Sequence, residues 1–237
     1  MLSIILPCYN EKDNLVALFE RLDLLVKASD EIEIVLVNNG SNDGSDIVFE
    51  QEVLSRSKEI FKIVHVKENK GYGFGILSGL RAAKGNVLAV THADRQTDPM
   101  DVLKAYEIYR SKGDLNLLIK GFRKNRKISE AVFSYGMGLL ASIVLGIRLT
   151  EINAQPKLFS KSFFETYEND APNDFSLDLY LLYQAKKHGQ IIDFPVYFSK
   201  RVAGEAKGGS GSSFKVKWKL IKRSFSYIFE LKKSLNN

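Results

Sequence analysis

The sequence is poor in the residues that stabilise secreted proteins. Cys8 is the single cysteine among 237 residues, so no disulfide bond can form within the chain. One cysteine is compatible with a reducing compartment, and we expect a cytoplasmic protein. Cys8 ends an apolar segment and has no histidine near it in the sequence, so we expect a small core residue and not a nucleophile.

Long hydrophobic runs are also absent. The longest uncharged segment, residues 131–147, has 17 residues and contains three glycines and two serines. A membrane-spanning helix needs about 20 apolar residues, so we expect a core helix or a helix in a membrane interface, and no crossing of the bilayer. The charged run Glu11–Lys12–Asp13 follows the apolar start closely, which is not the pattern of a secretory signal.

Negative charge is scarce at one end of the chain. The net charge is +6, and residues 200–237 alone contain ten Lys or Arg against two Glu. The remaining residues carry slightly more acidic than basic side chains. Because the positive charge is local, it favours an anionic membrane surface as the partner, and nucleic acid is the weakest candidate.

Short apolar segments alternate with helical periods in the first half of the chain. We predict buried strands at 2–6, 32–37, 60–66, 87–90 and 115–119, and helices at about 12–27, 46–57, 75–84 and 99–112. This alternation predicts an α/β fold with a mostly parallel sheet and helices on both faces. Ligands bind beyond the carboxyl ends of such strands, so the polar segments 7–11, 38–41 and 92–96 should meet at one edge.

The second half is less regular. It predicts helices at 129–145 and 178–187, a strand at 191–198, and a Gly/Ser-rich loop at 203–213. The last segment predicts an amphipathic helix whose apolar stripe is Phe214, Trp218, Ile221, Phe225 and Ile228. With lysines on its other faces, this helix could lie on an anionic membrane leaflet or dock its stripe on the domain.

Two common phosphate-binding motifs are absent. The P-loop pattern Gly-x4-Gly-Lys-Ser/Thr occurs nowhere, and the segment GYGFG (71–75) has Ile76 where a dinucleotide fingerprint needs a third glycine. By contrast, His92, Asp94 and Gln96 alternate along one segment, so their side chains point the same way if it is extended. These residue types favour a divalent cation that neutralises a diphosphate.

Three segments carry a more specific resemblance: SIILPCYNEKDNL (3–15), EIVLVNNGSNDGS (33–45) and NKGYGFGILSGLRAAKGNVLAVTHADRQTDP (69–99). They resemble the successive motifs of family 2 glycosyltransferases, which have the GT-A fold. The branch most similar to them contains the dolichol- and polyprenyl-phosphate sugar synthases. Segments 121–126, 152–161 and 194–209 resemble that branch more loosely. The resemblance implies one GT-A domain with a nucleotide-sugar half (1–115), an acceptor-side half (116–203) and a terminal loop and helix (204–237).

The resemblance also implies roles for individual residues. The nucleotide would contact Pro7, Tyr9, Glu11, Asn39, Asp43, Gly71, Gly73 and Ala93. The two glycines would let the backbone pass close to the nucleotide. Mg²⁺ or Mn²⁺ on the diphosphate of the donor would be held by Asp94, Gln96 and His92. Arg201 would close over the diphosphate, and the acceptor, a lipid phosphate in this branch, would contact Arg123, Arg126 and Ser134.

Two positions depart from the family pattern. The family usually has Asp where this chain has His92, and often has Asp where this chain has Asn38. Imidazole is neutral and favours softer metals than carboxylate does. We therefore expect Mn²⁺ to be used, or Asp94 and the donor phosphates to provide most of the binding.

Each candidate residue also has a simpler structural interpretation. We expect Asp98 to cap the helix that starts near Pro99, and we favour the metal over a capping role for Asp94. His92 is equally compatible with a metal ligand, a hydrogen-bonding neighbour or a spacer. Arg123 and Arg126 could belong to a solvated face. Asp178 could be a catalytic base, or an ordinary carboxylate at a surface or at a helix N-terminus.

The predicted reaction is transfer of a sugar from a nucleotide donor to polyprenyl phosphate at the membrane surface, with inversion at the sugar carbon by family resemblance. A phosphate acceptor is largely ionised near neutral pH and needs little help from a base, whereas a hydroxyl acceptor would require a carboxylate such as Asp178. The alternatives are a soluble glycosyltransferase with a hydroxyl acceptor, and a nucleotide-sugar-binding protein with weakened catalysis.

Overall fold

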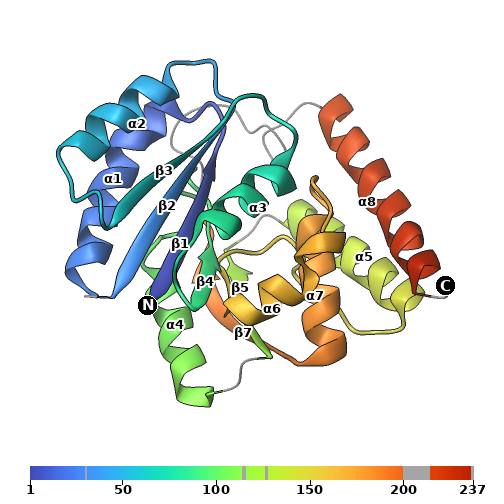
Figure 1. The fold of residues 1–237 in the computed structure, drawn as a ribbon. Helices are drawn as coiled ribbons and strands as arrows, with labels where there is room; N and C mark the ends of the chain where they lie inside the picture. The colour runs from blue at the N-terminus through green and yellow to red at the C-terminus, as the bar shows by residue number, and fades with distance from the viewer. Residues whose placement is uncertain (30, 114–115, 126–127, 200–213, 236–237) are drawn as a thin grey trace.

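The computed structural model describes residues 1–29, 31–113, 116–125, 128–199 and 214–235. Its centre is a seven-stranded sheet with the order β3-β2-β1-β4-β6-β5-β7 (Figure 1). The strands are β1 (Leu2–Cys8), β2 (Ile32–Asn39), β3 (Phe61–Val66), β4 (Val87–Val90), β5 (Leu117–Lys124), β6 (Lys157–Ser160) and β7 (Gln190–Tyr197). Strand β6 is antiparallel to β4 and β5, while the other pairings are parallel.

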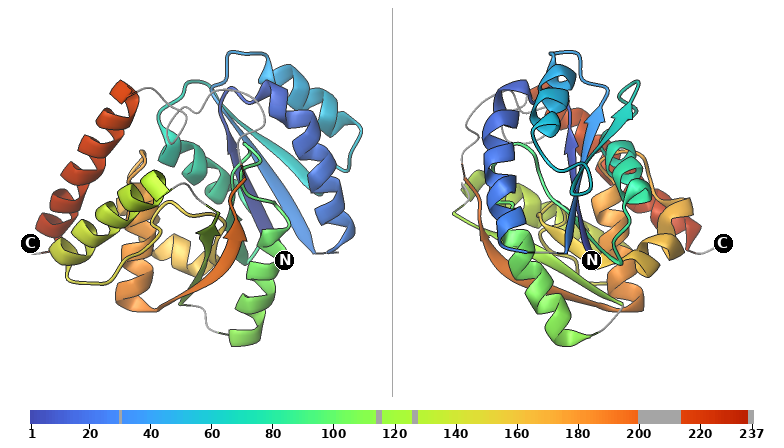
Figure 2. Two further views of the ribbon diagram at one scale, coloured as in Figure 1. Left: turned by 180° about the vertical axis from the view of Figure 1, so that it is seen from behind. Right: turned by 60° about the vertical axis from the view of Figure 1, so that its left-hand side comes forward.

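Helices cover both faces of the sheet (Figure 2). One face packs against α1 (Lys12–Lys27), α2 (Ser45–Leu54) and α4 (Asp101–Lys112). The other face packs against α3 (Tyr72–Ala82), α6 (Lys161–Tyr167) and α7 (Leu177–His188), with the short 3-10 helix η1 (Glu168–Asp170) after α6. The helices α5 (Ile128–Leu145) and α8 (Phe214–Ser234) lie side by side outside this second layer.

The alternation of side chains along the strands explains the two layers. Successive residues of a strand point to opposite faces. In β1, Ile5 belongs to the core on the α3 side, whereas Ile4 and Leu6 belong to the core on the α1 side. All three side chains are fully buried, and each contributes about 1.5–3 kcal/mol of hydrophobic free energy relative to an exposed side chain.

The expected elements of the first half are confirmed, with their ends shifted by up to five residues. The expectation that the third strand is buried is wrong, because most of β3 is half-buried. The structure also contains three elements that the sequence pattern did not predict, β6, α6 and η1. Strand β6 has only four residues, all of them buried, so it shows no alternation of polar and apolar side chains. It also begins with a buried lysine, which is rare in a strand core.

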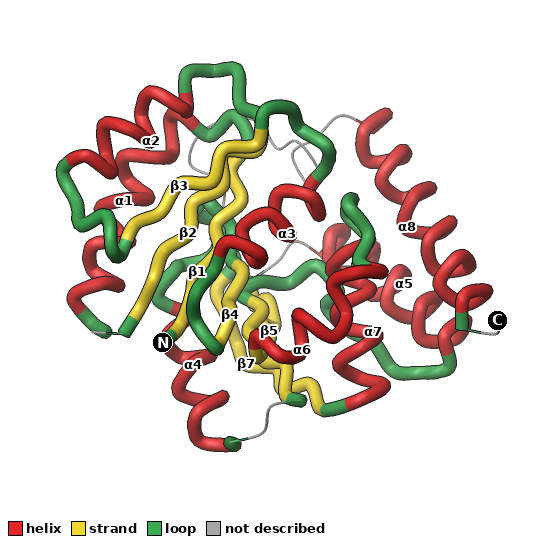
Figure 3. Tube along the Cα trace, viewed as in Figure 1, coloured by secondary structure: helices red, strands yellow, loops and turns green. Residues whose placement is uncertain are grey.

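The strand directions bring the expected polar segments to one edge. Because β6 is antiparallel to both β4 and β5, strands β5 and β7 run in the same direction as β1, β2 and β4. The segments after these strands therefore lie at the edge of the sheet opposite the N-terminus, where Figure 3 shows the loops after β1, β2 and β3 together. A direct contact confirms this placement, since the amide of Ser199 after β7 donates to the carbonyl of Gln96 after β4 at 2.8 Å.

Helices α5 and α8 expose large apolar side chains. The exposed apolar set, as we call it, consists of Val132, Tyr135, Leu139 and Ile143 on α5 and Trp218, Phe225 and Phe229 on α8. The opposite face of α8 docks on the domain through Tyr227, Ile228 and Leu231. The predicted single stripe of α8 is therefore wrong, because Ile228 is buried while Trp218 and Phe225 are exposed. No helix in the described ranges is long and apolar enough to span a membrane.

Candidate active site

The loops after β1 and β2 are joined by hydrogen bonds, and we call them the interlocked loops (residues 9–12 and 40–45). The Asn10 amide donates to Ser41 Oγ at 3.1 Å, and its side chain exchanges hydrogen bonds of 2.9 Å with the Asn42 side chain and amide. Asn10 has φ 55°, a left-handed conformation that asparagine tolerates better than most residues. The two loops therefore form one polar surface at the edge of the sheet.

Asp43 fixes the second of these loops. Its carboxylate accepts hydrogen bonds from the Lys12 amide at 3.1 Å and from the Ser45 amide and hydroxyl at 3.0 and 2.5 Å. Burial works to raise the pKa of Asp43, but these hydrogen bonds lower it below its usual value. The carboxylate is therefore charged at neutral pH and half-buried at the site where we predicted a nucleotide contact.

The other predicted nucleotide-binding residues differ in accessibility. Pro7 and Tyr9 are half-buried at the end of β1, whereas Glu11, Asn39 and Ala93 are buried. Glu11 accepts a 2.6 Å hydrogen bond from Asn14, and Asn39 donates to the Gly71 carbonyl at 3.1 Å. The methyl group of Ala93 belongs to the core on the α1 side, so only its backbone could face a ligand.

Gly71 and Gly73 lie against the backbone of the loop before α7. A Cβ on Gly71 would lie 2.5 Å from the Asn173 carbonyl oxygen, and one on Gly73 would lie 2.5 Å from the Pro172 carbonyl oxygen. Gly71 also has φ +120°, a conformation that favours glycine. In this structure the two glycines allow the start of α3 to approach the loop before α7. A contact with the nucleotide stays a prediction.

The Asp94 loop (residues 91–97) follows β4. Asp94 Oδ1 accepts from the Gln96 amide at 3.1 Å, which turns the chain, and Arg95 between them has φ 60°. Gln96 is tied to the end of β7, because its Nε2 lies 3.4 Å from the Ser199 carbonyl oxygen. The three predicted metal ligands, His92, Asp94 and Gln96, lie in this one loop at the edge of the sheet. All three side chains are half-buried.

These residues alone do not form a complete metal site. Among the residues that the structure describes, no group of three His, Cys, Asp or Glu side chains could hold a metal ion. The Asp94 loop contains one carboxylate, an amide and an imidazole, whereas Mg²⁺ takes six ligands and prefers oxygen. These three side chains could bind a cation that is also bound by a diphosphate, but they are too few to hold a cation without it.

Asp98 does not cap α4 as expected. Its Oδ1 accepts from the Met100 amide at 3.0 Å, but the helix begins at Asp101. Its carboxylate also pairs with Arg21 of α1, with the Arg21 Nε 2.9 Å from Oδ1. Asp98 therefore turns the chain ahead of α4 and ties this turn to α1.

Asp178 lies in the first turn of α7, and the interpretation as a surface carboxylate is wrong because the side chain is buried. Its Oδ1 accepts from Lys157 Nζ at 2.7 Å and from Gln155 Nε2 at 3.2 Å. The Tyr72 hydroxyl accepts a hydrogen bond from Gln155 Nε2 at 3.3 Å. We call these four residues the Asp178 cluster.

Burial governs the protonation of the Asp178 cluster. Desolvation lowers the pKa of Lys157, although the Asp178 carboxylate opposes this shift. Desolvation and the nearby carboxylates of Asp178 and Asp94 raise the pKa of Tyr72 well above its usual value. Tyr72 therefore keeps its proton at every physiological pH. Lys157 is the register partner of Val90, the residue before the Asp94 loop, which places the cluster beside this loop.

The predicted acceptor residues differ in their burial and their partners, and some lie outside the described residues. Arg123 is mostly buried and pairs with Glu151, with 2.7 Å between Nε and Oε2, so the interpretation as a solvated residue is wrong. Its guanidinium also lies over the Phe198 ring, 5.5 Å from the centroid. Ser134 lies half-buried on α5. The predicted residues Arg126 and Arg201 lie outside the described residues.

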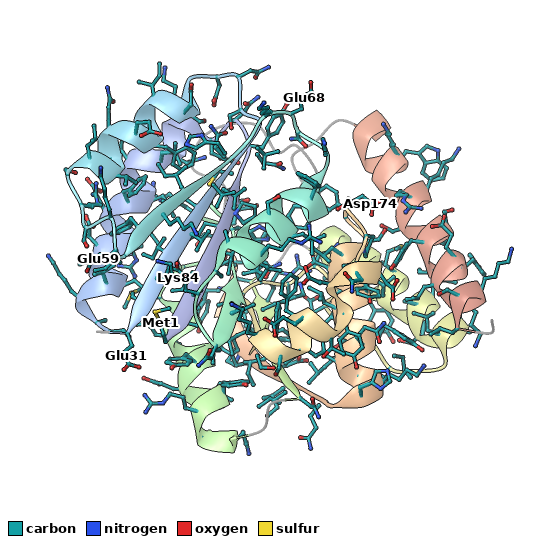
Figure 4. The ribbon with its side chains drawn as sticks, in the orientation of Figure 1. Met1, Glu31, Glu59, Glu68, Lys84 and Asp174 are labelled. Atoms are coloured by element: carbon teal, nitrogen blue, oxygen red, sulfur yellow. The ribbon has the colours of Figure 1, made fainter. Side chains whose placement is uncertain are left out.

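The C-terminal helix contacts the loop before α7. Arg223 Nε donates to Asp174 Oδ2 at 2.5 Å, and Figure 4 shows Asp174 at the tip of this loop, on the side of α8. In the same loop, Phe175 stacks on the Tyr72 ring with 4.6 Å between centroids. Helix α8 is thus joined to the Asp178 cluster through one loop.

Sequence analysis missed three members of this cluster: Tyr72, Gln155 and Lys157. Lys157 was the residue with a detectable signal, because a lysine between Pro156 and the apolar pair Leu158–Phe159 is unusual in a buried strand. Tyr72 and Gln155 are 83 positions apart, and no local pattern relates them.

Solved structures of two glycosyltransferases have a similar arrangement of sheet and helices. A mannosyltransferase from Pyrobaculum calidifontis in complex with GDP-Man and Mn²⁺ is 19% identical, with a TM-score of 0.61 over 85% of this chain and 57% of that chain. Glucosyl-3-phosphoglycerate synthase from Mycobacterium tuberculosis, in complex with Mn²⁺, UDP and phosphoglyceric acid, is 17% identical, with a TM-score of 0.65 over 86% and 71%. The fold is therefore the GT-A-like α/β fold.

The chain belongs to glycosyl transferase family 2, whose family model matches residues 3–166. It is 26% identical to a dolichol-phosphate mannosyltransferase of Pyrococcus furiosus over 98% of this chain and 63% of the relative. It is 27% identical to a dodecaprenyl-phosphate galacturonate synthase of Rhizobium johnstonii over 69% of this chain and 49% of the relative. The chain thus spans about half to two thirds of the length of these relatives.

Proposed function

We propose that the protein transfers a sugar from a nucleotide-sugar donor to a polyprenyl phosphate. The observation that carries this proposal is the meeting of the interlocked loops and the Asp94 loop at one edge of the sheet, beside the Asp178 cluster. The named relatives that use dolichol and dodecaprenyl phosphates support the acceptor class. Open parallel sheets that are flanked by helices bind ligands beyond the carboxyl ends of their strands, where these loops lie.

The donor would bind with its nucleoside against the interlocked loops, where Pro7, Tyr9 and Asp43 are accessible. Asp94, with Gln96 and His92, would hold Mg²⁺ or Mn²⁺, and the diphosphate would provide the remaining ligands. A bound cation stabilises the negative charge that develops on the leaving nucleoside diphosphate. Solved structures of the same fold that contain Mn²⁺ support this choice of cofactor.

The acceptor phosphate would bind at the ends of β5 and β7. Arg123 is paired with Glu151, so it would hold the phosphate through its remaining guanidinium N–H groups. Arg126 and Arg201, whose positions are predictions from sequence alone, would supply further positive charge. Attack by an ionised phosphate oxygen on the sugar carbon is expected to invert its configuration.

We also propose that α5 and α8 rest on the cytoplasmic face of a membrane. The exposed apolar set would enter the interface, and the basic residues of α8 would face anionic lipids, each contributing about 1 kcal/mol near the surface. Co-sedimentation with vesicles containing phosphatidylglycerol tests this placement. The double change Trp218→Ser and Phe229→Ser should weaken binding, whereas the matched change Val16→Ser and Leu54→Ser, at exposed sites on α1 and α2, should leave it unchanged. Equal binding by both variants would contradict the placement.

The function is tested by release of nucleoside diphosphate from a panel of nucleotide sugars with polyprenyl phosphate, and with free sugars as the comparison acceptors. We expect transfer to polyprenyl phosphate alone, and a donor-dependent rise in Tm with Mn²⁺ or Mg²⁺. Asp94→Asn should lower kcat/KM by about 100-fold or more, whereas Asp46→Asn on the exposed face of α2 should not change it.

Two results would overturn the proposed function. Transfer to sugar hydroxyls in place of polyprenyl phosphate would favour a soluble glycosyltransferase. Absence of transfer by the natural protein, with activity gained by His92→Asp, would favour a nucleotide-sugar-binding protein.

A further inference from the structure

A pocket lies on the face of the sheet that α7 covers, outside the candidate active site. It has a volume of about 210 Å³, and its walls are β5, β7, the second half of α7 and residues 148–150 after α5. None of the residues around it is a candidate for binding the nucleotide, the metal or the acceptor. Since a water molecule occupies about 30 Å³ of the liquid, a group of the size of a phosphate fits in this pocket.

The position of the pocket separates it from the predicted acceptor site. Lys120 and Asp193, which are register partners, are each the fourth residue of an eight-residue strand, whereas the acceptor is predicted to bind at the ends of these strands. Helix α7 leads into the start of β7, so it runs away from those ends. Leu182 and Lys186 follow Asp178 by four and eight residues on α7, which places them roughly 6 and 12 Å farther along the helix axis.

The charge around the pocket is mainly positive. Three cationic side chains border it, Lys120, Arg148 and Lys186, against the one carboxylate of Asp193. Arg148 and Lys186 are exposed, and neither has an ion-pair partner among the residues that the structure describes. Because the three like charges repel one another, an anion between them would be stabilised by all three.

Lys120 is the buried member of this group. Its side chain is 2% exposed, and its Nζ lies 2.9 Å from Asp193 Oδ1. An ammonium group has three N–H donors, and within the described ranges no acceptor besides Asp193 is available to them. Desolvation lowers the pKa of Lys120, although Asp193 opposes this shift. An anion in the pocket would accept a further hydrogen bond and favour the charged ammonium.

The neighbouring lysine shows what Lys120 lacks. Lys157 is the register partner of Lys120 and is also fully buried. Its partner Asp178 is 3% exposed, and the Ala154 carbonyl accepts a second hydrogen bond from Lys157 at 2.9 Å. Asp193, the partner of Lys120, is 36% exposed, so water weakens its attraction for the ammonium. The charge of Lys120 is therefore less completely neutralised than that of Lys157.

We propose that Lys120, Arg148 and Lys186 form a binding site for a phosphate group, separate from the candidate active site. A phosphate monoester carries about 1.5 to 2 negative charges at neutral pH and has three oxygens that accept strong hydrogen bonds, which matches three cationic donors. Free phosphate and the headgroup of an anionic lipid both present this chemistry. The site does not depend on the proposed transfer reaction.

Titration with inorganic phosphate tests the site. At equal ionic strength, phosphate should raise the Tm more than chloride does, because a ligand that binds the folded state stabilises it. Lys186→Met and Arg148→Met should each weaken the Kd for phosphate by about tenfold, through the loss of one charge-assisted contact. The matched control is Lys187→Met, which removes the same charge from the next residue of α7, outside the pocket. It should leave the Kd unchanged.

Asp193→Asn gives a readout of the opposite sign. It removes the carboxylate that competes with phosphate for Lys120, so phosphate should bind about tenfold more tightly. A side chain that only maintained the fold would give a loss of Tm and no gain in affinity. Weaker or unchanged phosphate binding by a folded Asp193→Asn would contradict the proposal.

Vesicles distinguish the two sources of the phosphate group. The probes are phosphatidylcholine vesicles with and without phosphatidic acid, whose headgroup is a phosphate monoester. If Lys186→Met binds the phosphatidic acid vesicles more weakly than Lys187→Met does, the pocket takes a lipid headgroup. Equal vesicle binding, with the tenfold loss of affinity for inorganic phosphate retained, assigns it to free phosphate.

One result would overturn the proposal whatever the source. If Lys186→Met and Lys187→Met do not differ in either assay, phosphate binds elsewhere on the protein or not at all. A natural protein that transfers no sugar would refute the proposed function and leave every expectation for this pocket unchanged, so the two proposals fail independently.

Discussion

The interlocked loops and the Asp178 cluster lie at the same edge of the sheet but are stabilised by different interactions. Asn10, Ser41 and Asn42 of the loops exchange neutral hydrogen bonds close to solvent. The cluster contains a lysine and an aspartate that are both removed from water. Neutral hydrogen bonds at a surface can be exchanged for bonds to a ligand at little cost, whereas a buried ion pair is favourable only when both partners are present.

This difference indicates how the two parts of the site divide the work. The loops provide a polar surface on which a nucleotide can replace water and existing hydrogen bonds. In the cluster, Gln155 Nε2 donates to the same Asp178 oxygen that pairs with Lys157, so its side chain is held against a buried ion pair. Neighbouring groups at this edge of the sheet thus differ in how easily their hydrogen bonds can be exchanged.

The largest expected effect comes from breaking the buried pair. Lys157→Met should lower the free energy of unfolding by about 3–5 kcal/mol, because it leaves the Asp178 carboxylate buried without its cation. The matched change Arg21→Met removes a half-exposed partner of Asp98 and should cost about 0–1 kcal/mol. Urea denaturation of both variants measures the difference, and equal losses would contradict the distinction between the two regions.

The next largest loss of stability is expected where the start of α3 packs against the loop before α7. Gly73→Ala places a Cβ 2.5 Å from the Pro172 carbonyl oxygen, and the required shift should cost about 1–3 kcal/mol. Gly136→Ala on α5 is the control, because a Cβ there meets nothing within 4 Å. It should stabilise the protein by about 0.5–1 kcal/mol through its helix propensity. A Tm of Gly73→Ala at or above that of Gly136→Ala would refute this packing role.

A smaller effect is expected from acid on the interlocked loops. The pKa of Asp43 is lower in the folded protein than in the unfolded chain. Its contribution to stability is therefore complete above the unfolded pKa, about 4, and is lost as the pH falls through the lower folded value. The free energy of unfolding of Asp43→Asn should fall less between pH 5 and 3, roughly the range of carboxylate titration, than that of the natural protein. Parallel curves would contradict this role.

The smallest expected effect concerns the contact of α8 with the rest of the domain. Arg223 pairs with Asp174 and Glu230, but its side chain is 39% exposed. Arg223→Met should therefore change the free energy of unfolding by only about 0–1 kcal/mol. Lys222→Met, at an exposed neighbouring position, is the matched control for loss of charge. A loss of several kcal/mol for Arg223→Met alone would mean that the loop before α7 depends on α8.

Much of the fold could be predicted because its first half consists of local repeats of strand and helix. The strands β1–β4 and the helices between them each produce a pattern within their own residues, and parallel topology then places their ends together. The position of the Asp94 loop followed directly from this reasoning. Its candidate metal ligands could be named because carboxylate, amide and imidazole groups follow a buried strand, and their role stays a prediction.

The second half of the chain could not be predicted in the same way. The partners Lys157 and Asp178 are separated by 21 residues, and neither the four-residue β6 nor its antiparallel direction has a periodic pattern. The glycines at 71 and 73 were singled out for a nucleotide contact, whereas the backbone that they approach in the structure is about a hundred residues away in the sequence. The buried side of α8 was misplaced because apolar side chains lie on more than one of its faces.

The antiparallel strand β6 limits the insertions and deletions that the chain can tolerate. Alternate residues of a strand face opposite sides of the sheet, so removing one residue between 152 and 156 and sliding the strand by one step would exchange its two faces. Leu158 would then take the place of Lys157, and the lysine would enter the apolar layer beneath α4. The length of this connection is therefore as strictly determined as the identity of the residues it joins.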